Sequence, residues 1–180
     1  MKHFVLVFLL IPFSIFGQEP PINALQKLGP NPYYLFDSTQ IYQSDLESID
    51  PNQISSLTIL LDTSAIEQFG VEAKDGAVII ETKNFARKKF TTFFRQVSLQ
   101  YDSLFTLMGS DSTFQYILND KIKTDNYEGD LSMIDKGILI DIFIINSDQL
   151  FNTYGISDKK YGIIIKSKKP KDLFRSDEKF

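Results

Sequence analysis

The stretch LTILLDTSAIEQFGVEAKDGAVIIETK, residues 57–83, decides the fold because the chain contains a second version of it. Residues 142–168, IFIINSDQLFNTYGISDKKYGIIIKSK, follow at a constant offset of 85. Both copies run through an apolar strand, a polar helix start, a short helix, an aromatic residue before glycine, a charged loop, an apolar strand and a lysine. Six positions are identical: Ile59/Ile144, Gly70/Gly155, Lys74/Lys159, Ile79/Ile164, Ile80/Ile165 and Lys83/Lys168. Such self-similarity at a fixed spacing indicates an internal repeat.

The repeat extends upstream of these segments. YYLFDSTQI at 33–41 is similar to QYILNDKIK at 115–123, with an offset of 82 and three extra residues in the loop that follows the second copy. Each half therefore reads as strand, strand, helix, strand. The apolar runs at 78–80 and 163–165 suit strands buried on both faces, and the helix before each favours a parallel βαβ unit with a right-handed crossover. The prediction is a mixed α+β and α/β fold with one repeat over 31–83 and the other over 113–168.

Glycines mark the ends of the predicted elements. Gly70 and Gly155 fall where each short helix must stop, and a left-handed residue is common there. Gly76 and Gly162 lie at the start of the last strand of each repeat, and we expect all four to be structural. A phosphate-binding loop would need its amides at the start of a helix, whereas these glycines follow one. No nucleotide or other cofactor is predicted.

The two short helices carry further signals at their starts. Ser64 and Glu67 have the spacing of a capping box, and so do Asn146 and Gln149. The predicted inward faces are Ala65, Ile66 and Phe69 in the first helix and Leu150, Phe151 and Tyr154 in the second.

An amphipathic helix is predicted between the repeats, within residues 84–112 and from about Phe85 to Met108. Apolar residues recur at spacings of three, four and seven, which is typical of one helix face: Phe90, Phe94, Val97, Tyr101, Leu104, Phe105 and Met108. Gly109 ends the run. This face could bind a partner or a membrane surface, but we expect it to pack across both repeats and join them in one core.

Both ends of the chain lie outside the repeats. Residues 1–17 have a basic start, an apolar run from Phe4 to Phe16 and a small residue, Gly17, which is the layout of a secretory signal peptide. We expect cleavage near Gly17, no later transmembrane segment, and a mature protein in the periplasm or outside the cell. Residues 18–30 read as a linker and residues 169–180 as a charged tail.

The amino-acid inventory limits the possible chemistry. The chain has no cysteine and no tryptophan, and its single histidine, His3, lies in the predicted signal peptide. Histidine-based nucleophiles, thiol chemistry and histidine or thiolate zinc sites are therefore excluded for the mature protein. Its 18 Lys and Arg (19 less Lys2) against 23 Asp and Glu give a charge of −5, which argues against nucleic-acid binding. No catalytic residue and no metal site is predicted.

Carboxylates are the remaining route to catalysis. Asp62 and Asp148 lie where a helix cap is expected, and Asp141 interrupts an apolar strand, where solvent exposure is the simplest explanation. A carboxylate-based hydrolase would need two acids across a cleft, and no such pair is evident. A small-ligand site for an oligosaccharide or peptide is the other alternative, in a groove between the repeats lined by Tyr33, Tyr34, Tyr116 and Tyr161.

Residues 45–83 resemble the plug-domain segment of TonB-dependent outer-membrane receptors, especially the SusC-like type of Bacteroidetes. The similarity is carried by Pro51, Asn52, Ile54, Leu57, Ile59, Asp62, Ser64, Ala65, Phe69, Gly70, Gly76 and the run from Ile79 to Lys83. It returns in weaker form in the second half. The resemblance implies a duplicated plug-like fold in an envelope protein, without the receptor's barrel. The expected function is a non-catalytic interaction module, accessory to TonB-dependent uptake, whose partner is an envelope protein.

Overall fold

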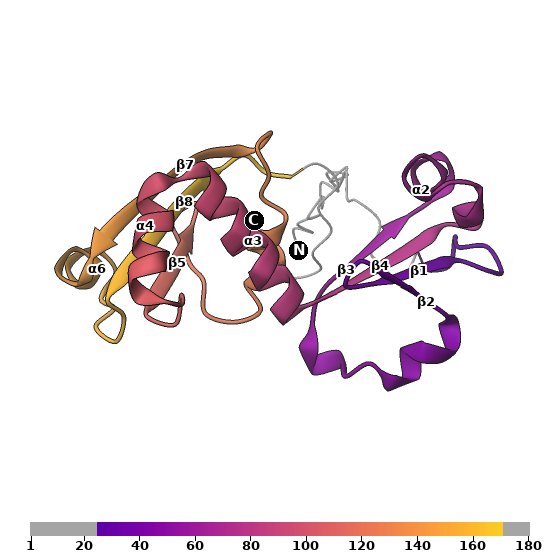
Figure 1. Cartoon of the computed structure of the whole chain (residues 1–180), viewed down its shortest axis with the longest axis horizontal. Coiled ribbons are helices and arrows are strands. Elements are labelled where there is room, and N and C mark those ends of the chain that lie inside the picture. Colours follow the sequence, from indigo (N-terminus) through magenta and orange to yellow (C-terminus); the bar gives the residue numbers. More distant parts are fainter. Residues whose placement is uncertain (1–24, 171–180) are drawn as a thin grey trace, which may run out of the picture.

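The computed structural model describes residues 25–170 and folds them into two four-stranded sheets with helices (Figure 1). The first half contains β1 (Tyr33–Phe36), β2 (Thr39–Ile41), η1 (Gln43–Ser48), η2 (Pro51–Gln53), β3 (Ile54–Leu60), α2 (Asp62–Phe69), η3 (Val71–Ala73) and β4 (Ala77–Thr82). Two helices follow, α3 (Lys83–Val97) and α4 (Leu99–Met108). The second half contains β5 (Phe114–Leu118), β6 (Lys121–Ile122), α5 (Glu128–Ser132), β7 (Leu139–Asn146), α6 (Ser147–Tyr154) and β8 (Tyr161–Ser167). The expected signal peptide, most of the linker and the tail from residue 171 lie outside the described residues.

The predicted mixed fold class is confirmed, and the two sheets repeat each other strand by strand. Their orders are β2-β1-β4-β3 and β6-β5-β8-β7. Tyr34 pairs with Val78 in the first sheet, and Tyr116 pairs with Ile163 in the second, which are the partners that offsets of 82 and 85 require. Even the irregularity in β3 at 54–56 returns in β7 at 139–141.

The strand pairing differs from the prediction. β3 and β4 are antiparallel neighbours, as are β7 and β8, and the parallel partner of each last strand is β1 or β5. The predicted parallel crossover through the short helix is therefore wrong. The eight residues of α2 span about 12 Å, too short to return along the seven residues of β3, about 23 Å. The helix instead acts as a wide hairpin connection, so Leu60 at the end of β3 pairs with Ala77 at the start of β4.

The stretch expected as the first strand of each repeat is a hairpin of two strands. Asp37 and Ser38 have φ angles of 46° and 68°, and Asn119 and Asp120 have 48° and 67°. Two consecutive positive angles form the two-residue turn that matches the twist of antiparallel strands. Each repeat therefore has four strands rather than three.

The connecting helix is also broken. α3 ends at Val97, and Ser98 caps α4 by accepting a hydrogen bond from the Tyr101 amide (3.2 Å). Val97 is 37% exposed, although Phe90, Phe94 and Tyr101 are fully buried as predicted. Gly109 ends α4 in a left-handed conformation.

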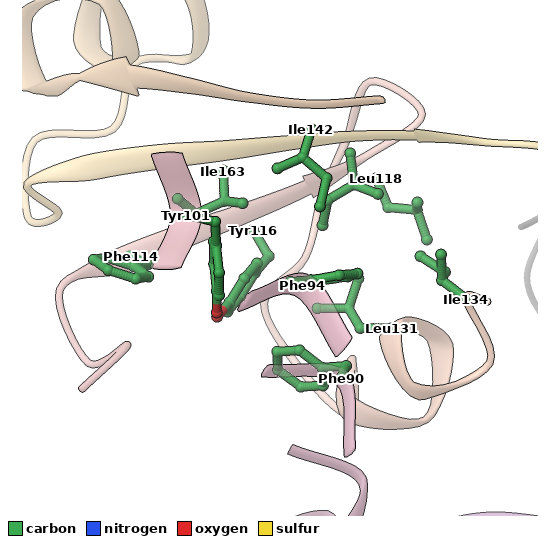
Figure 2. Close-up of a cluster of buried hydrophobic side chains, with 11 residues drawn as sticks. Phe90, Phe94, Tyr101, Phe114, Tyr116, Leu118, Leu131, Ile134, Ile142 and Ile163 are labelled. Atoms are coloured by element: carbon green, nitrogen blue, oxygen red, sulfur yellow. The ribbon is translucent and has the colours of Figure 1, made fainter. Parts of the chain in front are cut away.

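Most of the buried side chains belong to α3, α4 and the second half, and Figure 2 shows their main cluster. The main cluster contains Phe90, Phe94, Tyr101, Phe114, Tyr116, Leu118, Leu131, Ile134, Ile142, Ile163 and Ile165, so α3, α4 and α5 pack on one face of the second sheet. A smaller cluster of Ala65, Ala73 and Ala77 lies under α2. The expectation of one core shared by both repeats is therefore wrong, because the aromatic face of α3 and α4 packs on the second sheet.

The small helices α2 and α6 lie on the sheet faces opposite to the face that α3, α4 and α5 cover. In each repeat the side chains of the small helix and of the strand beneath it are matched in size. Ala65 of α2 is buried in one cluster with Ala77 of β4, and the equivalent residues are Leu150 and Gly162. A Cβ atom on Gly162 would lie 3.0 Å from Leu150 Cδ1 and 2.7 Å from Ile145 Cγ1. The second repeat therefore places a large residue on the helix where its strand has glycine.

Candidate functional site

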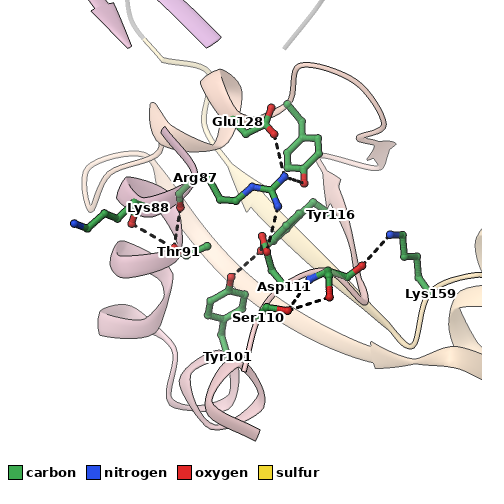
Figure 3. Close-up of polar contacts among 11 residues, drawn as sticks. Arg87, Lys88, Thr91, Tyr101, Ser110, Asp111, Tyr116, Glu128 and Lys159 are labelled. Atoms are coloured by element: carbon green, nitrogen blue, oxygen red, sulfur yellow. Dashed lines mark hydrogen bonds and ion pairs between the residues drawn. The ribbon is translucent and has the colours of Figure 1, made fainter. Parts of the chain in front are cut away.

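Arg87 of α3 is the centre of a polar network on the second half (Figure 3). Its guanidinium lies 3.3 Å from Asp111 Oδ1 and 3.0 Å from Glu128 Oε1, and it donates a hydrogen bond to the Tyr127 hydroxyl (2.8 Å). The Arg87 side chain is 39% exposed, whereas those of Asp111 and Glu128 are 8% and 9% exposed. The arginine therefore compensates two carboxylates that are nearly buried.

The network continues into the core through two tyrosines. Tyr116 donates its hydroxyl hydrogen to Asp111 Oδ2 (3.1 Å), and its oxygen lies 2.7 Å from that of Tyr101. Since the Tyr116 hydrogen is directed to Asp111, Tyr101 must be the donor to Tyr116. The chain of hydrogen bonds thus runs from α4 through β5 to Asp111 and Arg87.

Burial raises the pKa of the Tyr101 and Tyr116 phenols, because an anion in the core would lose its hydration. Burial likewise raises the pKa of Tyr127. Partial burial would lower the pKa of Arg87, but the hydrogen bond to Glu128 and the charge of Asp111 outweigh it and raise that pKa. The phenols are therefore neutral and Arg87 is positively charged near neutral pH.

An open pocket of about 510 Å³ adjoins this network. Its walls come from α3, β5, the segment 123–128 and the loop before β8: Lys83, Arg87, Phe114, Gln115, Tyr116, Lys123, Thr124, Asp125, Asn126, Tyr127, Glu128, Asp158 and Lys159. Lys159 donates a hydrogen bond to the Ser112 carbonyl (3.0 Å). The lining residues include both cations and carboxylates, so the pocket suits a polar ligand with both donors and acceptors.

A second ion pair lies deeper in the same half. Lys123 Nζ is 2.7 Å from Asp130 Oδ2, and the two side chains are 7% and 2% exposed. Gln115 donates to the Lys123 carbonyl (2.6 Å), which holds the segment after β6 against the sheet. In the first repeat Ile41 occupies the position of Lys123, so this pair is a feature of the second repeat.

The predicted tyrosine groove is not formed by the described residues. Tyr33 stacks on Phe69 in the first half, with ring centroids 5.0 Å apart, whereas Tyr161 packs edge-on against Phe114 in the second. Tyr116 is 1% exposed and belongs to the core, and Tyr34 is on the first sheet. Of the four, only Tyr116 lines the pocket, because the two sheets stand apart and do not face each other across a groove (Figure 1).

Three of the four glycines predicted to be structural have a positive φ, and the fourth, Gly162, does not. Gly70 and Gly155 have φ angles of 80° and 71°, as expected at the ends of α2 and α6, and Gly76 has 91°. The Gly76 carbonyl also accepts the Tyr33 amide (2.9 Å). Gly162 has no positive φ and is structural for a different reason, the close approach of Ile145 and Leu150.

The capping box predicted for α6 is confirmed, and the one predicted for α2 is wrong. Asn146 and Gln149 form the predicted capping box, but α2 begins at Asp62, so Ser64 lies inside its first turn and cannot cap it. Asp62 and Asp148 are likewise in first turns, beyond the cap residues Leu61 and Asn146. Ile66 (40% exposed) and Phe151 (57% exposed) point away from the core, contrary to the predicted inward faces.

Of the residues of the network, only Tyr101, as part of the apolar helix face, and Tyr116, as part of the expected groove, were named from the sequence; the charged residues and Tyr127 were not singled out. Arg87 reads as part of the polar face of an amphipathic helix, and its partners lie 24 and 41 residues further along the chain. Among residues 25–170, no group of carboxylates is arranged to hold a metal ion. The helices in that range are also too short or too polar to cross a membrane.

Comparison of the chain with protein-family models, with characterised proteins and with solved structures finds no match. The resemblance to the plug domain therefore stays a prediction from the residues that carry it.

Proposed function

We propose that this chain is an exported, non-catalytic interaction module of the bacterial envelope, accessory to TonB-dependent uptake. The signal-peptide pattern and the plug-like residues between 45 and 83 motivate this proposal. Its partner is an envelope protein. The structural observation that carries the proposal is the unequal covering of two equivalent sheet faces.

The sheet face that carries Ile163 and Ile165 in the second half is covered by α3, α4 and α5. The equivalent face of the first half carries Val78 and Ile80, and the connection that follows its hairpin, η1 and η2, has no buried residue. A repeat that keeps its strand register but leaves this face less covered is suited to binding another protein rather than to sealing a core.

The charged groups of the second half favour a structural role over catalysis. Asp111 and Glu128 are both engaged by Arg87, and Asp130 is engaged by Lys123. A glycosidase-type mechanism needs one carboxyl group that is free to hold and deliver a proton. These carboxylates are instead committed to ion pairs that join α3 to α5 and to the segment before β5, and the segment after β6 to α5.

The proposal is tested by affinity purification of the tagged protein from the envelope fraction of its host after chemical crosslinking. We expect one envelope component to be enriched over a tagged control protein exported by the same route. Mass spectrometry of the mature N-terminus, expected near Gln18, tests export in the same sample. Retention of Met1, or enrichment of no envelope component, would contradict the proposal.

A second candidate function is the binding of a small polar ligand, favoured by the open pocket beside Arg87. A thermal-shift screen with oligosaccharides and short peptides tests it, since a ligand that binds only the folded state raises the melting temperature. Lys83→Ala, at the edge of the pocket, is expected to reduce such a shift.

A further inference from the structure

The two sheets allow a residue-by-residue comparison of one apolar face, which we name the Tyr34 face in the first half. Paired residues of neighbouring strands point to the same side of a sheet. The apolar residues of the Tyr34 face are therefore Tyr34, Phe36, Ile41, Leu57, Ile59, Val78 and Ile80, and the exposed Thr39 lies on the same side. Its counterparts in the second half are Tyr116, Leu118, Lys123, Ile142, Ile144, Ile163 and Ile165.

Most of the counterparts are covered, and the Tyr34 face is covered less. Tyr116, Leu118 and Ile163 are at most 1% exposed under α3 and α4, Ile142 is 7% exposed, and Ile144 is partly buried. On the Tyr34 face, Val78 and Ile80 of the central strand are buried, but Leu57 is 46% exposed and the other four residues are only partly buried. The difference is greatest on β3, where Leu57 corresponds to Ile142.

The order of elements along the chain explains the difference. The helices that cover the second sheet, α3 and α4, directly precede β5 and span residues 83–108. The equivalent place in the first half is the segment before β1. Of this segment the structure describes residues 25–32, which contain Gly29, Pro30 and Pro32. Proline interrupts helices, so these eight described residues do not supply a helix pair comparable to α3 and α4.

The covering element of the second half shows what chemistry fits this kind of face. Phe90 and Phe94 of α3 lie one helical turn apart, and Tyr101 of α4 packs edge-on against Phe94 with centroids 5.7 Å apart. The Tyr101 hydroxyl bonds to Tyr116, whose counterpart on the Tyr34 face is the partly buried Tyr34. An amphipathic helix with aromatic residues at i and i+4 therefore matches the Tyr34 face as α3 and α4 match the second sheet.

We propose that the Tyr34 face is the docking surface for an amphipathic helix of the partner protein that carries large aromatic side chains at i and i+4. This inference deepens the proposed function and rests on it for the existence of a partner. The occupant completes in the first repeat the cover that α3 and α4 provide in the second.

The test uses a synthetic peptide with the sequence of residues 83–108 as the probe and the purified full protein as the receptor. We expect the peptide to bind, and a peptide with aspartate at positions 90 and 94 to bind at least tenfold more weakly. Leu57→Lys in the protein should weaken binding of the original peptide at least tenfold. Thr58→Lys is the matched control, because Thr58 is exposed on the opposite face of the same strand, and it should change binding less than twofold.

Absence of peptide binding, or equal binding by the Leu57→Lys protein, would overturn the proposed surface. Circular dichroism and melting of each variant show whether it is folded, which is expected because Leu57 and Thr58 are both exposed. If the protein is a dimer that Leu57→Lys converts to a monomer, a second copy occupies the face and the helix assignment is wrong.

The host experiment separates this inference from the proposed function. A photo-crosslinking residue at position 57 should join the partner within a segment that has aromatics at i and i+4, and one at position 58 should not. A partner that is captured equally from both positions leaves the interaction module standing and overturns the docking surface. Peptide binding that depends on Leu57, without any envelope partner, supports the surface and contradicts the module.

Discussion

Thr82 is joined to Asp37 by two hydrogen bonds, one from the Thr82 amide to Oδ1 and one from its hydroxyl to Oδ2, both 2.7 Å long. The same link recurs in the second repeat, where Asn119 accepts the Ser167 amide (3.0 Å) and donates to its hydroxyl (3.5 Å). In both places the residue that starts a tight turn ties it to the end of the last strand. The repeat thus preserves this link while the side chains that make it have changed.

The first prediction concerns this link. Asp37→Asn should change the free energy of unfolding by less than about 0.5 kcal/mol, because Asn can accept the Thr82 amide as Asn119 accepts that of Ser167 and tolerates a positive φ. Asp37→Ala should cost about 1–3 kcal/mol, since it leaves a partly buried amide without its acceptor. Urea denaturation of the two variants checks this, and equal losses in both would contradict it.

The second prediction concerns the side chains that meet between α6 and β8, where a large residue on the helix faces a glycine on the strand. Gly162→Ala should destabilise the protein by about 1–3 kcal/mol, because the new methyl group would meet Ile145 and Leu150. Leu150→Ala alone should cost about 2–5 kcal/mol through the cavity it leaves. The double variant recreates the Ala65 and Ala77 pair of the first repeat.

A double-mutant cycle measures the coupling of these two positions. We expect the double variant to lose less stability than the sum of the single losses, by about 0.5–3 kcal/mol. Strict additivity would show that Gly162 is required for a reason other than the bulk of Leu150.

The parts of the fold that could be predicted from sequence are those set by local signals. The ends of α2 and α6 at Gly70 and Gly155, the positive φ of these glycines and the capping box of α6 follow from short-range patterns, and the repeat follows from the constant offset. The hairpin turns were missed because Asp37-Ser38 and Asn119-Asp120 lack the glycine that usually marks a two-residue turn. The antiparallel pairing was missed because apolar strands next to a helix do not show in which direction the chain returns.

The polar site was beyond sequence reasoning for a different reason. Arg87, Asp111 and Glu128 come together only because α3 packs on β5 and α5 folds back beside it. Their spacing in the chain carries no motif. The broken connecting helix was missed as well, since apolar spacing continues past Ser98 and only its role as a cap separates α3 from α4.

The third prediction concerns the buried pair of Lys123 and Asp130. Lys123→Ile introduces into the second repeat the residue type that the first repeat has at the equivalent position, Ile41. It should lower the free energy of unfolding by about 3–5 kcal/mol, because it removes the cation beside a buried carboxylate.

The matched variant for this test removes the charge as well. Lys123→Ile combined with Asp130→Asn should be more stable than Lys123→Ile alone, as measured by thermal and urea unfolding. A double variant less stable than the single one would show that Asp130 acts mainly through contacts other than Lys123.

The last prediction concerns stability at alkaline pH. Because burial raises the pKa of Tyr101 and Tyr116, the folded state keeps two phenolic protons that unfolded tyrosines release near pH 10. Above about pH 10 the unfolded state therefore binds fewer protons than the folded state, and stability falls as pH rises. Each buried phenol should contribute up to about 1.4 kcal/mol per pH unit to that decline, whereas below about pH 9 neither contributes a slope.

The Tyr101→Phe and Tyr116→Phe double variant will lose stability at neutral pH, because Asp111 loses a donor, but its alkaline decline should be shallower than that of the wild type. Urea unfolding at a series of pH values from neutral to above 10 measures both slopes, and since all lysines are retained in the variant, their contribution cancels in the comparison. Equal slopes would mean that the two phenols ionise as freely in the folded protein as in the unfolded chain, contrary to their burial in the core.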